Sequence, residues 1–342
     1  MVRARHDPSA IGNEQVFPRI SIVTPSYNRA ALIEETIRSV VCQNYPNLEY
    51  VVIDGGSQDN TVNILKKYST NLTFWVSEPD EGQVDAINKG FRHTTGDILA
   101  WINSDDLYVH GALQAAARAF MEDPSIDILY GACDLIDEGG EYLCTYSTPM
   151  FNHVLELGSN RLLQPATFFR RRVFENVGGL NPSLHYSFDY DFWLRASLRG
   201  FRFVSNPGPP LARFRLWRQS KTGSDPNRFI EETTGIIADI FHDASMPDQL
   251  KSLRDWTLSG VWRSGALDYW RAGKMKETRR CIANMIIGYP ARMADVRMLI
   301  LYLLTLGGPR LNARIAHWNY RVKRARSRCI AALHGQTALG IA

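Results

Sequence analysis

Two adjacent carboxylates and an amide follow a short apolar run that ends at Ile102, in the order Asn103-Ser104-Asp105-Asp106. Because a buried unpaired carboxylate is costly, such a cluster is expected where a strand leaves the core and faces solvent or an ion. Oxygen ligands of this kind suit Mg²⁺ or Mn²⁺, which usually complete their coordination with waters and substrate phosphates. The alternative is a strand-to-helix turn in which Asp105 or Asp106 caps a helix that begins near Val109.

A second acidic pair, Asp189 and Asp191, lies in the segment Phe188-Asp189-Tyr190-Asp191-Phe192-Trp193-Leu194-Arg195. Apolar residues at 188, 192 and 198 predict a helix packed against a sheet, with Asp189 in its first turn. Residues two apart do not share a helical face, so the two carboxylates are expected to point in different directions. The alternative role for Asp189 is to stabilise the helix N-terminus, a contribution of ~0.3–1 kcal/mol.

The first 132 residues alternate strand-like and helix-like segments at close spacing. Continuous apolar runs separated by amphipathic helices predict an α/β fold whose mostly parallel sheet is flanked by helices on both faces. The expected strands are 20–24, 48–54, 72–77, 97–102 and 126–131, and the expected helices are 31–43, 61–68, 83–92 and 109–122.

Polar loops follow four of the expected strands, at 24–29, 54–59, 78–83 and 103–106. Ligands of open α/β sheets gather beyond the carboxyl ends of the strands, so these loops predict one ligand site at one edge. The sequence has no GxGxxG after a strand and no GxxxxGK[ST], which argues against a dehydrogenase or a P-loop enzyme. The segment Gly55-Gly56-Ser57-Gln58-Asp59 departs from GxSxG at its last residue, which disfavours a serine hydrolase.

Composition is consistent with a globular enzyme. A length of 342 residues allows one large domain with an appendage. Five scattered cysteines without a CxxC spacing indicate neither a zinc site nor a disulfide framework. The polar N-terminus lacks the apolar core of a signal peptide, so the cytoplasm is the expected location.

Several motifs in a fixed order resemble family 2 glycosyltransferases. They are Thr24-Pro25-Ser26-Tyr27-Asn28-Arg29, Val52-Ile53-Asp54-Gly55-Gly56-Ser57-Gln58-Asp59-Asn60-Thr61, Asp85-Ala86-Ile87-Asn88-Lys89-Gly90 and Asn103-Ser104-Asp105-Asp106. The resemblance covers roughly residues 19–222. It implies the A-type glycosyltransferase fold, a nucleotide-sugar donor and a divalent metal, Mn²⁺ or Mg²⁺.

The resemblance implies donor-side roles for ten residues, with the metal held by Asp105 and Asp106. Asp54 would accept a hydrogen bond from the base, although a glycine-rich turn with local bonds is the alternative. Asn103 occupies the first position of a usual Asp-x-Asp motif, so metal binding is expected to be weaker than usual. The expected nucleotide-sugar residues are Thr24, Pro25, Tyr27, Asp54, Asp85, Asn88, Lys89, Asn103, Ser104 and Asp105.

On the acceptor side, the resemblance makes Asp189 the general base, with Asp191 in reserve. Phe188 stands where the family commonly has Glu. Gln164 is expected to bind an acceptor hydroxyl, and Trp217 to stack on the sugar or cap the cleft, where many relatives carry His. Arg215 and Lys221 would neutralise the leaving diphosphate, unless they belong to a solvated basic loop.

The C-terminal third reads as helical and basic. Nine Lys and Arg residues lie between Arg292 and Arg328, against the single acid Asp295. The apolar run 296–306 is shorter than the ~20 residues that cross a bilayer. It suits either a helix lying at a membrane surface or a buried helix of a small helical subdomain.

Three parts are therefore expected: a polar segment 1–18, a catalytic domain 19–225 and a helical extension 226–342. Within the catalytic domain, 19–132 would bind the nucleotide-sugar and 133–225 the acceptor. The predicted activity is an inverting hexosyltransferase of polysaccharide biosynthesis, with a UDP-sugar favoured as donor and a glycan or polyprenyl-linked glycan as acceptor. The enzyme would be cytoplasmic or peripheral on the inner face of the cell membrane.

Two other classes compete with this prediction. A non-catalytic relative that binds a nucleotide-sugar or a glycan would explain Asn103, Phe188 and Trp217 at positions that often carry an acid or His. A nucleic-acid-binding protein would rest on the basic C-terminal region alone. No nucleic-acid partner is expected, because no recognisable reading motif accompanies that charge.

Overall fold

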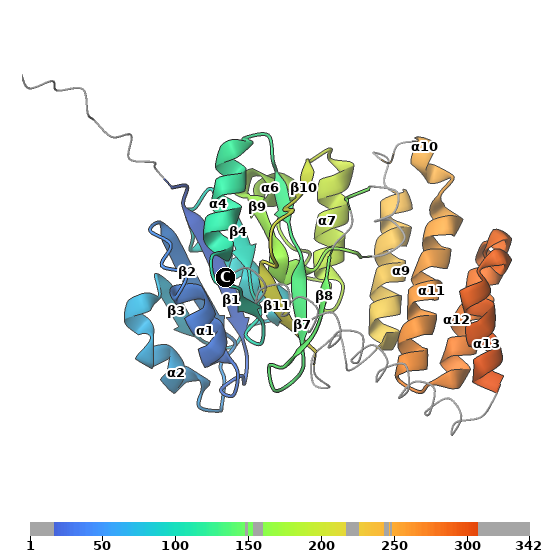
Figure 1. Ribbon diagram of the computed structural model, residues 1–342, viewed down its shortest axis with the longest axis horizontal. Helices are drawn as coiled ribbons and strands as arrows, with labels where there is room; N and C mark the ends of the chain where they lie inside the picture. Colours follow the sequence, from blue (N-terminus) through green and yellow to red (C-terminus); the bar gives the residue numbers. More distant parts are fainter. Residues whose placement is uncertain are drawn as a thin grey trace, which may run out of the picture.

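The computed structural model describes residues 17–147, 150–152, 160–216, 226–242, 246 and 248–306. Its main sheet contains β1 (Ile20–Ser26), β2 (Leu48–Asp54), β3 (Phe74–Ser77), β4 (Ile98–Trp101), β6 (Ile128–Tyr130), β9 (Thr167–Arg170) and β10 (Phe203–Ser205). Their spatial order is β10-β6-β9-β4-β1-β2-β3 (Figure 1). Two neighbouring strands, β4 and β1, run parallel, as do β1 with β2 and β2 with β3.

One strand runs against the others. β9 pairs antiparallel with both β4 and β6, in the middle of the sheet. The short helix η2 (Gln164–Ala166) leads directly into this strand. A smaller sheet has the order β5-β11-β7-β8, made from β5 (Leu107–Tyr108), β7 (Cys133–Ile136), β8 (Tyr142–Tyr146) and β11 (Ala212–Arg215).

Helices cover both faces of the main sheet, so the expected α/β architecture is confirmed (Figure 1). Alternate residues of β1 belong to different hydrophobic clusters, Ile22 to one and Val23 to the other, because successive side chains of a strand point to opposite faces. On the Ile22 face lie α1 (Ile33–Val41), α2 (Thr61–Lys67) and α4 (Ala112–Glu122). On the Val23 face lie α3 (Gln83–Arg92), α6 (Arg171–Val177) and α7 (Phe188–Leu198).

A glycine sets the distance between α3 and the sheet. A Cβ atom at Gly90 would lie 2.4 Å from Cγ1 of Val23 and 3.3 Å from Cγ1 of Ile53. Contacts this short are impossible without movement, so only glycine lets α3 rest directly on β1 and β2. The close packing holds the N-terminal end of α3 near the carboxyl ends of these strands.

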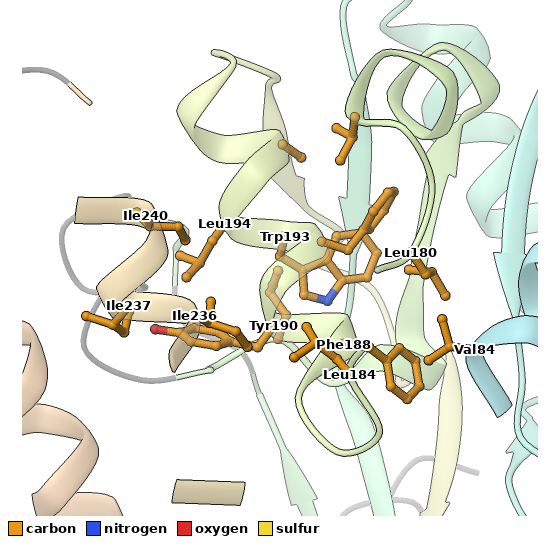
Figure 2. Packing of buried hydrophobic residues seen from close by; sticks show 14 of the residues in the cluster. Val84, Leu180, Leu184, Phe188, Tyr190, Trp193, Leu194, Ile236, Ile237 and Ile240 are labelled. Atoms are coloured by element: carbon orange, nitrogen blue, oxygen red, sulfur yellow. The ribbon is translucent and has the colours of Figure 1, made fainter. Parts of the chain in front are cut away.

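The C-terminal helices continue the core of the catalytic domain. They comprise α9 (Pro226–His242), α10 (Asp248–Lys251), α11 (Arg254–Arg271), α12 (Met275–Gly288), η3 (Pro290–Ala294) and α13 (Val296–Leu306). Figure 2 shows Ile237 and Ile240 of α9 facing Tyr190 and Leu194 of α7, and all four side chains are buried in one cluster. The first helix of the expected extension therefore packs directly against the helix that carries Asp189.

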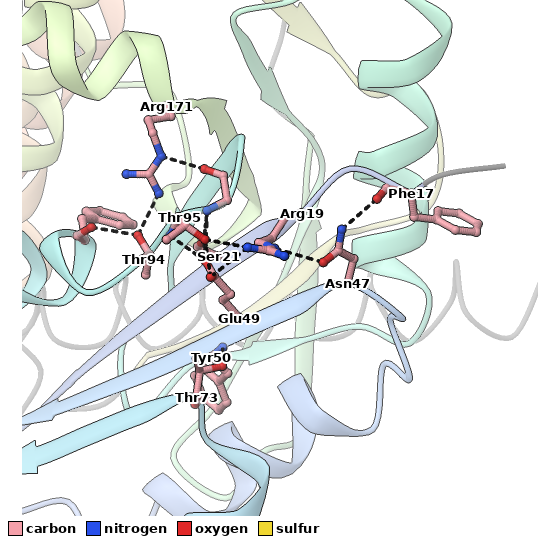
Figure 3. A network of polar contacts seen from close by, with 12 residues as sticks. Phe17, Arg19, Ser21, Asn47, Glu49, Tyr50, Thr73, Thr94, Thr95 and Arg171 are labelled. Atoms are coloured by element: carbon pink, nitrogen blue, oxygen red, sulfur yellow. Dashed lines mark hydrogen bonds and ion pairs between the residues drawn. The ribbon is translucent and has the colours of Figure 1, made fainter. Parts of the chain in front are cut away.

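Polar contacts join the elements at the amino edge of the sheet, opposite the polar loops (Figure 3). Glu49 accepts hydrogen bonds from the hydroxyl of Ser21 at 2.6 Å and from the backbone N–H of Thr95 at 2.7 Å. Arg171 donates to the carbonyl of Gly96 at 2.8 Å. These bonds tie the starts of β1 and β2 to the α3–β4 loop, so this edge is occupied by structural contacts.

Candidate active site

The loops that follow β1 and β2 are joined into one unit. Asn28, which has a positive φ of 50°, donates its backbone N–H to Oγ of Ser57 at 2.7 Å, and its side-chain oxygen accepts the N–H of Gln58 at 2.8 Å. Asp59 accepts the N–H of Ala30 at 3.0 Å. Asn tolerates the left-handed conformation better than most residues. The side chains of Asn28 and Asp59, which lie within the quoted motifs, thus join the loops that follow β1 and β2.

Asp54 ends β2 and is fully buried. Its carboxylate accepts hydrogen bonds from the N–H and the hydroxyl of Ser57, at 2.9 and 2.6 Å, and from the hydroxyl of Ser77 at 2.6 Å. A carboxylate offers about four acceptor positions, so one remains beside these three donors. The local turn bonds considered as the alternative are present, and a contact with a base stays a prediction.

The residues of the first motif differ strongly in exposure. Tyr27 is 58% exposed at the end of β1, where its ring is accessible to a ligand. Pro25 is buried within the strand. The side chain of Thr24 was expected to line a nucleotide pocket, but it is buried and its hydroxyl lies 3.0 Å from that of Tyr50. Thr24 therefore belongs to the core, and this expectation is corrected.

Asp80 is a further acid at this edge, and the sequence predicted no role for it. A Cβ atom at Gly55 would lie 2.8 Å from Oδ2 of Asp80, so the carboxylate sits against the glycine turn that follows Asp54. Burial raises the pKa of Asp80, and the charges of Asp85 and Asp54 raise it further. Asp85 accepts the N–H of Glu81 at 3.4 Å. The position of Asp80 in the loop after the third strand is the feature of the sequence that could have indicated a place at this edge.

Asn88 and Lys89 are engaged in contacts within the protein. The side chain of Asn88 donates to the carbonyl of Leu180 at 2.9 Å and accepts the N–H of the same residue at 3.1 Å. Lys89 forms an ion pair with Glu78. Both ends of the Asn88 amide fasten α3 to the loop after α6, and a contact of Asn88 with a ribose or a diphosphate stays a prediction.

A chain of amides fixes the residues that follow β4. Gln83 donates to the side-chain oxygen of Asn103 at 2.6 Å, and Asn103 donates to Asp106 at 3.2 Å and to Gln164 at 3.4 Å. Gln164 is buried and donates to the carbonyl of Trp101 at 2.6 Å. Gln164 was expected to bind an acceptor hydroxyl, but both ends of its amide are used here. Ser104 is also buried.

Asp106 lies in the interior, with 1% of its surface exposed. It accepts the backbone N–H of Arg215 at 3.0 Å, and burial, reinforced by the charge of Asp105, raises its pKa well above the usual value. These contacts turn Asp106 toward the interior, and its role as a metal ligand stays a prediction. Asp106 does not cap a helix, because α4 begins at Ala112 after Gly111.

Arg215 is 2% exposed and serves a structural purpose. Its guanidinium donates to the carbonyls of Asp105 at 3.0 Å and Glu138 at 2.9 Å, and it pairs with the carboxylate of Glu35 at 2.7 Å. Arg215 thus holds the backbone of Asp105. Its expected role toward a leaving diphosphate stays a prediction. Trp217 and Lys221 lie outside the described residues.

The two carboxylates of α7 have different surroundings. Oδ2 of Asp191 lies 2.6 Å from the guanidinium of Arg195, which also donates to the carbonyls of Val177 at 2.7 Å and Gly179 at 2.9 Å. Asp189 is half-buried and accepts the amide of Asn160 at 3.1 Å. Burial raises its pKa. Asp191 is thus committed to an ion pair, whereas Asp189 has the environment of an acid–base group.

Aromatic contacts place the start of α7 beside the end of β4. The ring of Trp101 lies 6.3 Å from that of Phe188 and 5.7 Å from that of Trp193. Trp101 is the last residue of β4, and the acidic cluster begins two residues later. Asn160 and Gln164 lie in one short segment and reach Asp189 and Asn103, respectively. Asp189 and the cluster after β4 are therefore supported by the same elements.

Within the described part of the chain, no group of three His, Cys, Asp or Glu side chains could hold a metal ion. Mg²⁺ and Mn²⁺ are often bound through one or two carboxylates together with substrate phosphates. Asp105, which is half-buried at the edge, fits that pattern as a single protein ligand. The donor set is smaller than expected because Asp106 is buried and an amide stands at position 103.

Comparisons with known proteins identify the family of the chain. The sequence model "Glycosyl transferase family 2" matches residues 21–178. An uncharacterised glycosyltransferase of Mycobacterium tuberculosis is 30% identical over 184 residues, which covers 53% of this chain and 70% of the relative. A further one, from Haemophilus influenzae, is 27% identical over 185 residues, 52% of this chain and 61% of the relative. The chain belongs to glycosyltransferase family 2.

Solved structures share the fold at low sequence identity. S. aureus TarS 1-349 in complex with UDP-GlcNAc has a TM-score of 0.60 and 17% identity, covering 90% of this chain and 92% of that one. The mannosyltransferase PcManGT from Pyrobaculum calidifontis, in complex with GDP-Man and Mn²⁺, has a TM-score of 0.53 and 20% identity, covering 89% and 88%. The architecture is the A-type glycosyltransferase fold.

Proposed function

We propose that this protein transfers a sugar from a nucleotide-sugar, with a UDP-sugar favoured, to a hydroxyl of a glycan or lipid-linked glycan. The observation that carries the proposal is the grouping of Asp54, Asp80, Asp85 and Asp105 on the carboxyl edge, with Asp189 held beside it on α7. Ligands of such sheets bind at this edge. The neighbouring structures with UDP-GlcNAc and with GDP-Man and Mn²⁺ support a nucleotide-sugar donor.

On the donor side, Tyr27 offers an exposed ring and Asp54 a remaining acceptor position for the base. Asp105 would hold a divalent ion, which when bound stabilises charge on the departing nucleoside diphosphate. Arg215 and the Gln83–Asn103 bond keep the loop around Asp105 in place. Because these contacts are made within the protein itself, the edge is preorganised to accept a donor.

On the acceptor side, we assign the general base to Asp189. A base works best when its pKa lies closer to the working pH than that of an ordinary carboxylate, and burial shifts Asp189 in that direction. Its carboxylate would take the proton of the acceptor hydroxyl as that oxygen attacks the anomeric carbon. A single displacement from the face opposite the leaving group inverts the anomeric centre. Asp191 serves to hold α7 in place through Arg195.

The acceptor and the location follow from the same proposal. A polyprenyl-linked glycan would be presented at the inner face of the cell membrane, where the basic C-terminal region would lie. A role in polysaccharide biosynthesis would then follow.

The test is release of nucleoside diphosphate from UDP-, GDP- and dTDP-sugars with Mn²⁺ or Mg²⁺. Metal-dependent release from one donor, lost in Asp105→Asn but kept in the exposed control Asp255→Asn, is the expected result. Donor binding without release under every acceptor tried would favour a non-catalytic binding protein. Equal release by wild type and Asp105→Asn contradicts the proposed site.

A further inference from the structure

The outermost helix of the chain, α13, presents an apolar face to solvent. Successive residues of a helix are ~100° apart, so Val296, Leu299, Ile300, Leu303 and Leu306 fall on one side. Each of these five is exposed, with Leu303 at 64% and Val296 at 63%. The opposite side is buried through Met298, Leu301 and Thr305. A helix at the surface of a globular protein normally shows the reverse, with its polar side outward.

The face lies at the end of the molecule farthest from the sheet. The helices α9, α11, α12 and α13 follow one another away from the catalytic domain, and α13 comes last (Figure 1). Arg279 of α12 donates to the carbonyl of Thr305, so the two last helices run antiparallel. Exposed apolar side chains also occur at Ile287, at the end of α12, and at Met293 in η3. Contiguous apolar surface of this kind marks an interaction site.

Basic side chains are exposed on α12 and α13, the last two α-helices that the structure describes. Arg297 is exposed on α13, and Lys276 and Arg280 are exposed on α12. The acid nearest along the chain, Asp295, is paired with Arg263 at 2.8 Å. From Met275 to the end, the sequence carries twelve Lys and Arg residues and two acids. A partner that binds this end of the molecule would therefore contact both exposed apolar and exposed basic side chains.

We propose that the outward face of α13, together with Lys276, Arg280 and Arg297, docks the protein on an anionic lipid bilayer. Apolar side chains of such a helix enter the headgroup boundary while Lys and Arg contact anionic lipids. The charge selects this partner over a second copy of the chain, because two copies would bring like charges together. None of the described helices combines the length and the apolar character of a membrane-spanning segment.

The proposal rests on the proposed function in one respect, because the proposed lipid-linked acceptor would lie at the same membrane surface. The binding itself is independent of sugar transfer. A loss of vesicle binding with donor binding intact would therefore separate the two.

The experiment is co-sedimentation of the full-length protein with phosphatidylcholine vesicles, with and without phosphatidylglycerol. Wild type should pellet with the anionic vesicles, and added salt should weaken the binding. Leu303→Glu should lower the partition coefficient about tenfold. A second variant, with Lys276, Arg280 and Arg297 all changed to Gln, should lower it about a hundredfold. Met150→Glu, which changes an 85% exposed apolar residue elsewhere, should bind as wild type.

Three results would overturn the proposal. Wild type that stays in the supernatant with anionic vesicles shows that the face has another occupant. Leu303→Glu that pellets as wild type assigns the binding to another part of the chain. A wild-type dimer that Leu303→Glu converts to a monomer, with vesicle binding unchanged, makes the face a contact between copies. Thermal unfolding of each variant verifies that it is folded.

Discussion

The guanidinium of Arg195 lies 2.6 Å from Oδ2 of Asp191, one turn earlier on α7, and the same guanidinium donates to the carbonyls that end α6. This ion pair gives Asp191 surroundings that differ from those of Asp189, although the two acids are only two residues apart in sequence. Asp191 anchors the helix. Asp189 instead accepts a hydrogen bond from the amide of Asn160 and has a raised pKa.

The two acids should therefore respond differently to substitution. Asp189→Asn should lower kcat by ~10²–10⁴-fold, because it removes the proton acceptor, while donor binding and the free energy of unfolding change little. Asp191→Asn should mainly destabilise the protein, by about 3 kcal/mol, because it leaves Arg195 without its partner. Urea denaturation and steady-state kinetics on both variants distinguish the roles. A larger loss of kcat in a stable Asp191→Asn protein would reverse the assignment.

Asp106 should make the protein less stable as the pH rises. Its pKa is raised in the folded state, so the folded protein holds this proton more tightly than the unfolded chain, whose Asp pKa is about 3.9. That stabilisation is complete below the unfolded pKa and is lost as pH rises through the folded pKa. In urea titrations above about pH 5, wild type should lose stability relative to Asp106→Asn with increasing pH.

The matched control for that titration is Asp123→Asn. The hydrogen bond from Ser125 and that from Arg202 lower the pKa of Asp123, so its contribution is complete above the unfolded pKa and is lost only as the pH falls. The difference in the free energy of unfolding between Asp123→Asn and wild type should therefore stay constant over the same pH range. If the difference in the free energy of unfolding between Asp106→Asn and wild type is also constant over this pH range, the carboxyl of Asp106 does not titrate within it.

Glu232 of α9 should act as a positioning residue for Asp189. Its carboxylate accepts the backbone N–H groups of His185, Tyr186 and Ser187, at 2.9, 2.7 and 2.9 Å, just before α7 begins. Glu232→Gln replaces one acceptor oxygen by a donor, so the turn before Asp189 should shift. We expect about a tenfold lower kcat with an unchanged KM for the donor, and a displaced acidic limb of the pH–rate profile.

The exposed neighbour Glu231 provides the control for Glu232. Glu231→Gln should leave kcat and the pH profile unchanged. If Glu232→Gln lowers stability but keeps the wild-type pH profile and kcat, its role is structural and the link to Asp189 fails.

Gly90 and Gly235 are two helical glycines whose substitution by alanine tests how closely α3 packs on the sheet. Gly90→Ala forces a Cβ to within 2.4 Å of Val23 and should cost ~1–3 kcal/mol in the free energy of unfolding. Gly235→Ala on α9 meets nothing within 4 Å and should instead stabilise by ~0.5–1 kcal/mol, because alanine favours the helix. Chemical denaturation of the two variants compares them directly. Equal effects would contradict the close contact between α3 and β1.

The sequence predicted the local elements well because their periodicity is local. The expected strand 48–54 and helix 83–92 match β2 and α3 to the residue. The helix expected at 109–122 begins three residues later, because Leu107 and Tyr108 pair with β11 as a short strand. The antiparallel insertion of β9 between β4 and β6 was not predicted, since no local pattern reports which strands become neighbours.

Long-range contacts explain why the surroundings of several site residues could not be predicted. Asp106 and Arg215 are 109 residues apart, and Asn88 and Leu180 are 92 apart, yet each pair is joined by hydrogen bonds. Such partners consume a side chain that the sequence leaves apparently available for a ligand. Residue type and strand-end position correctly indicated an acidic edge, but burial decided which acids face outward.

The most direct measurement is a calorimetric titration of the protein with UDP, in the presence and absence of Mn²⁺. Binding at the carboxyl edge through Asp105 predicts affinity that depends on Mn²⁺ in wild type and in Asp255→Asn, and a loss of that dependence in Asp105→Asn. Binding by Asp105→Asn with unchanged affinity and unchanged Mn²⁺ dependence would contradict the proposed site.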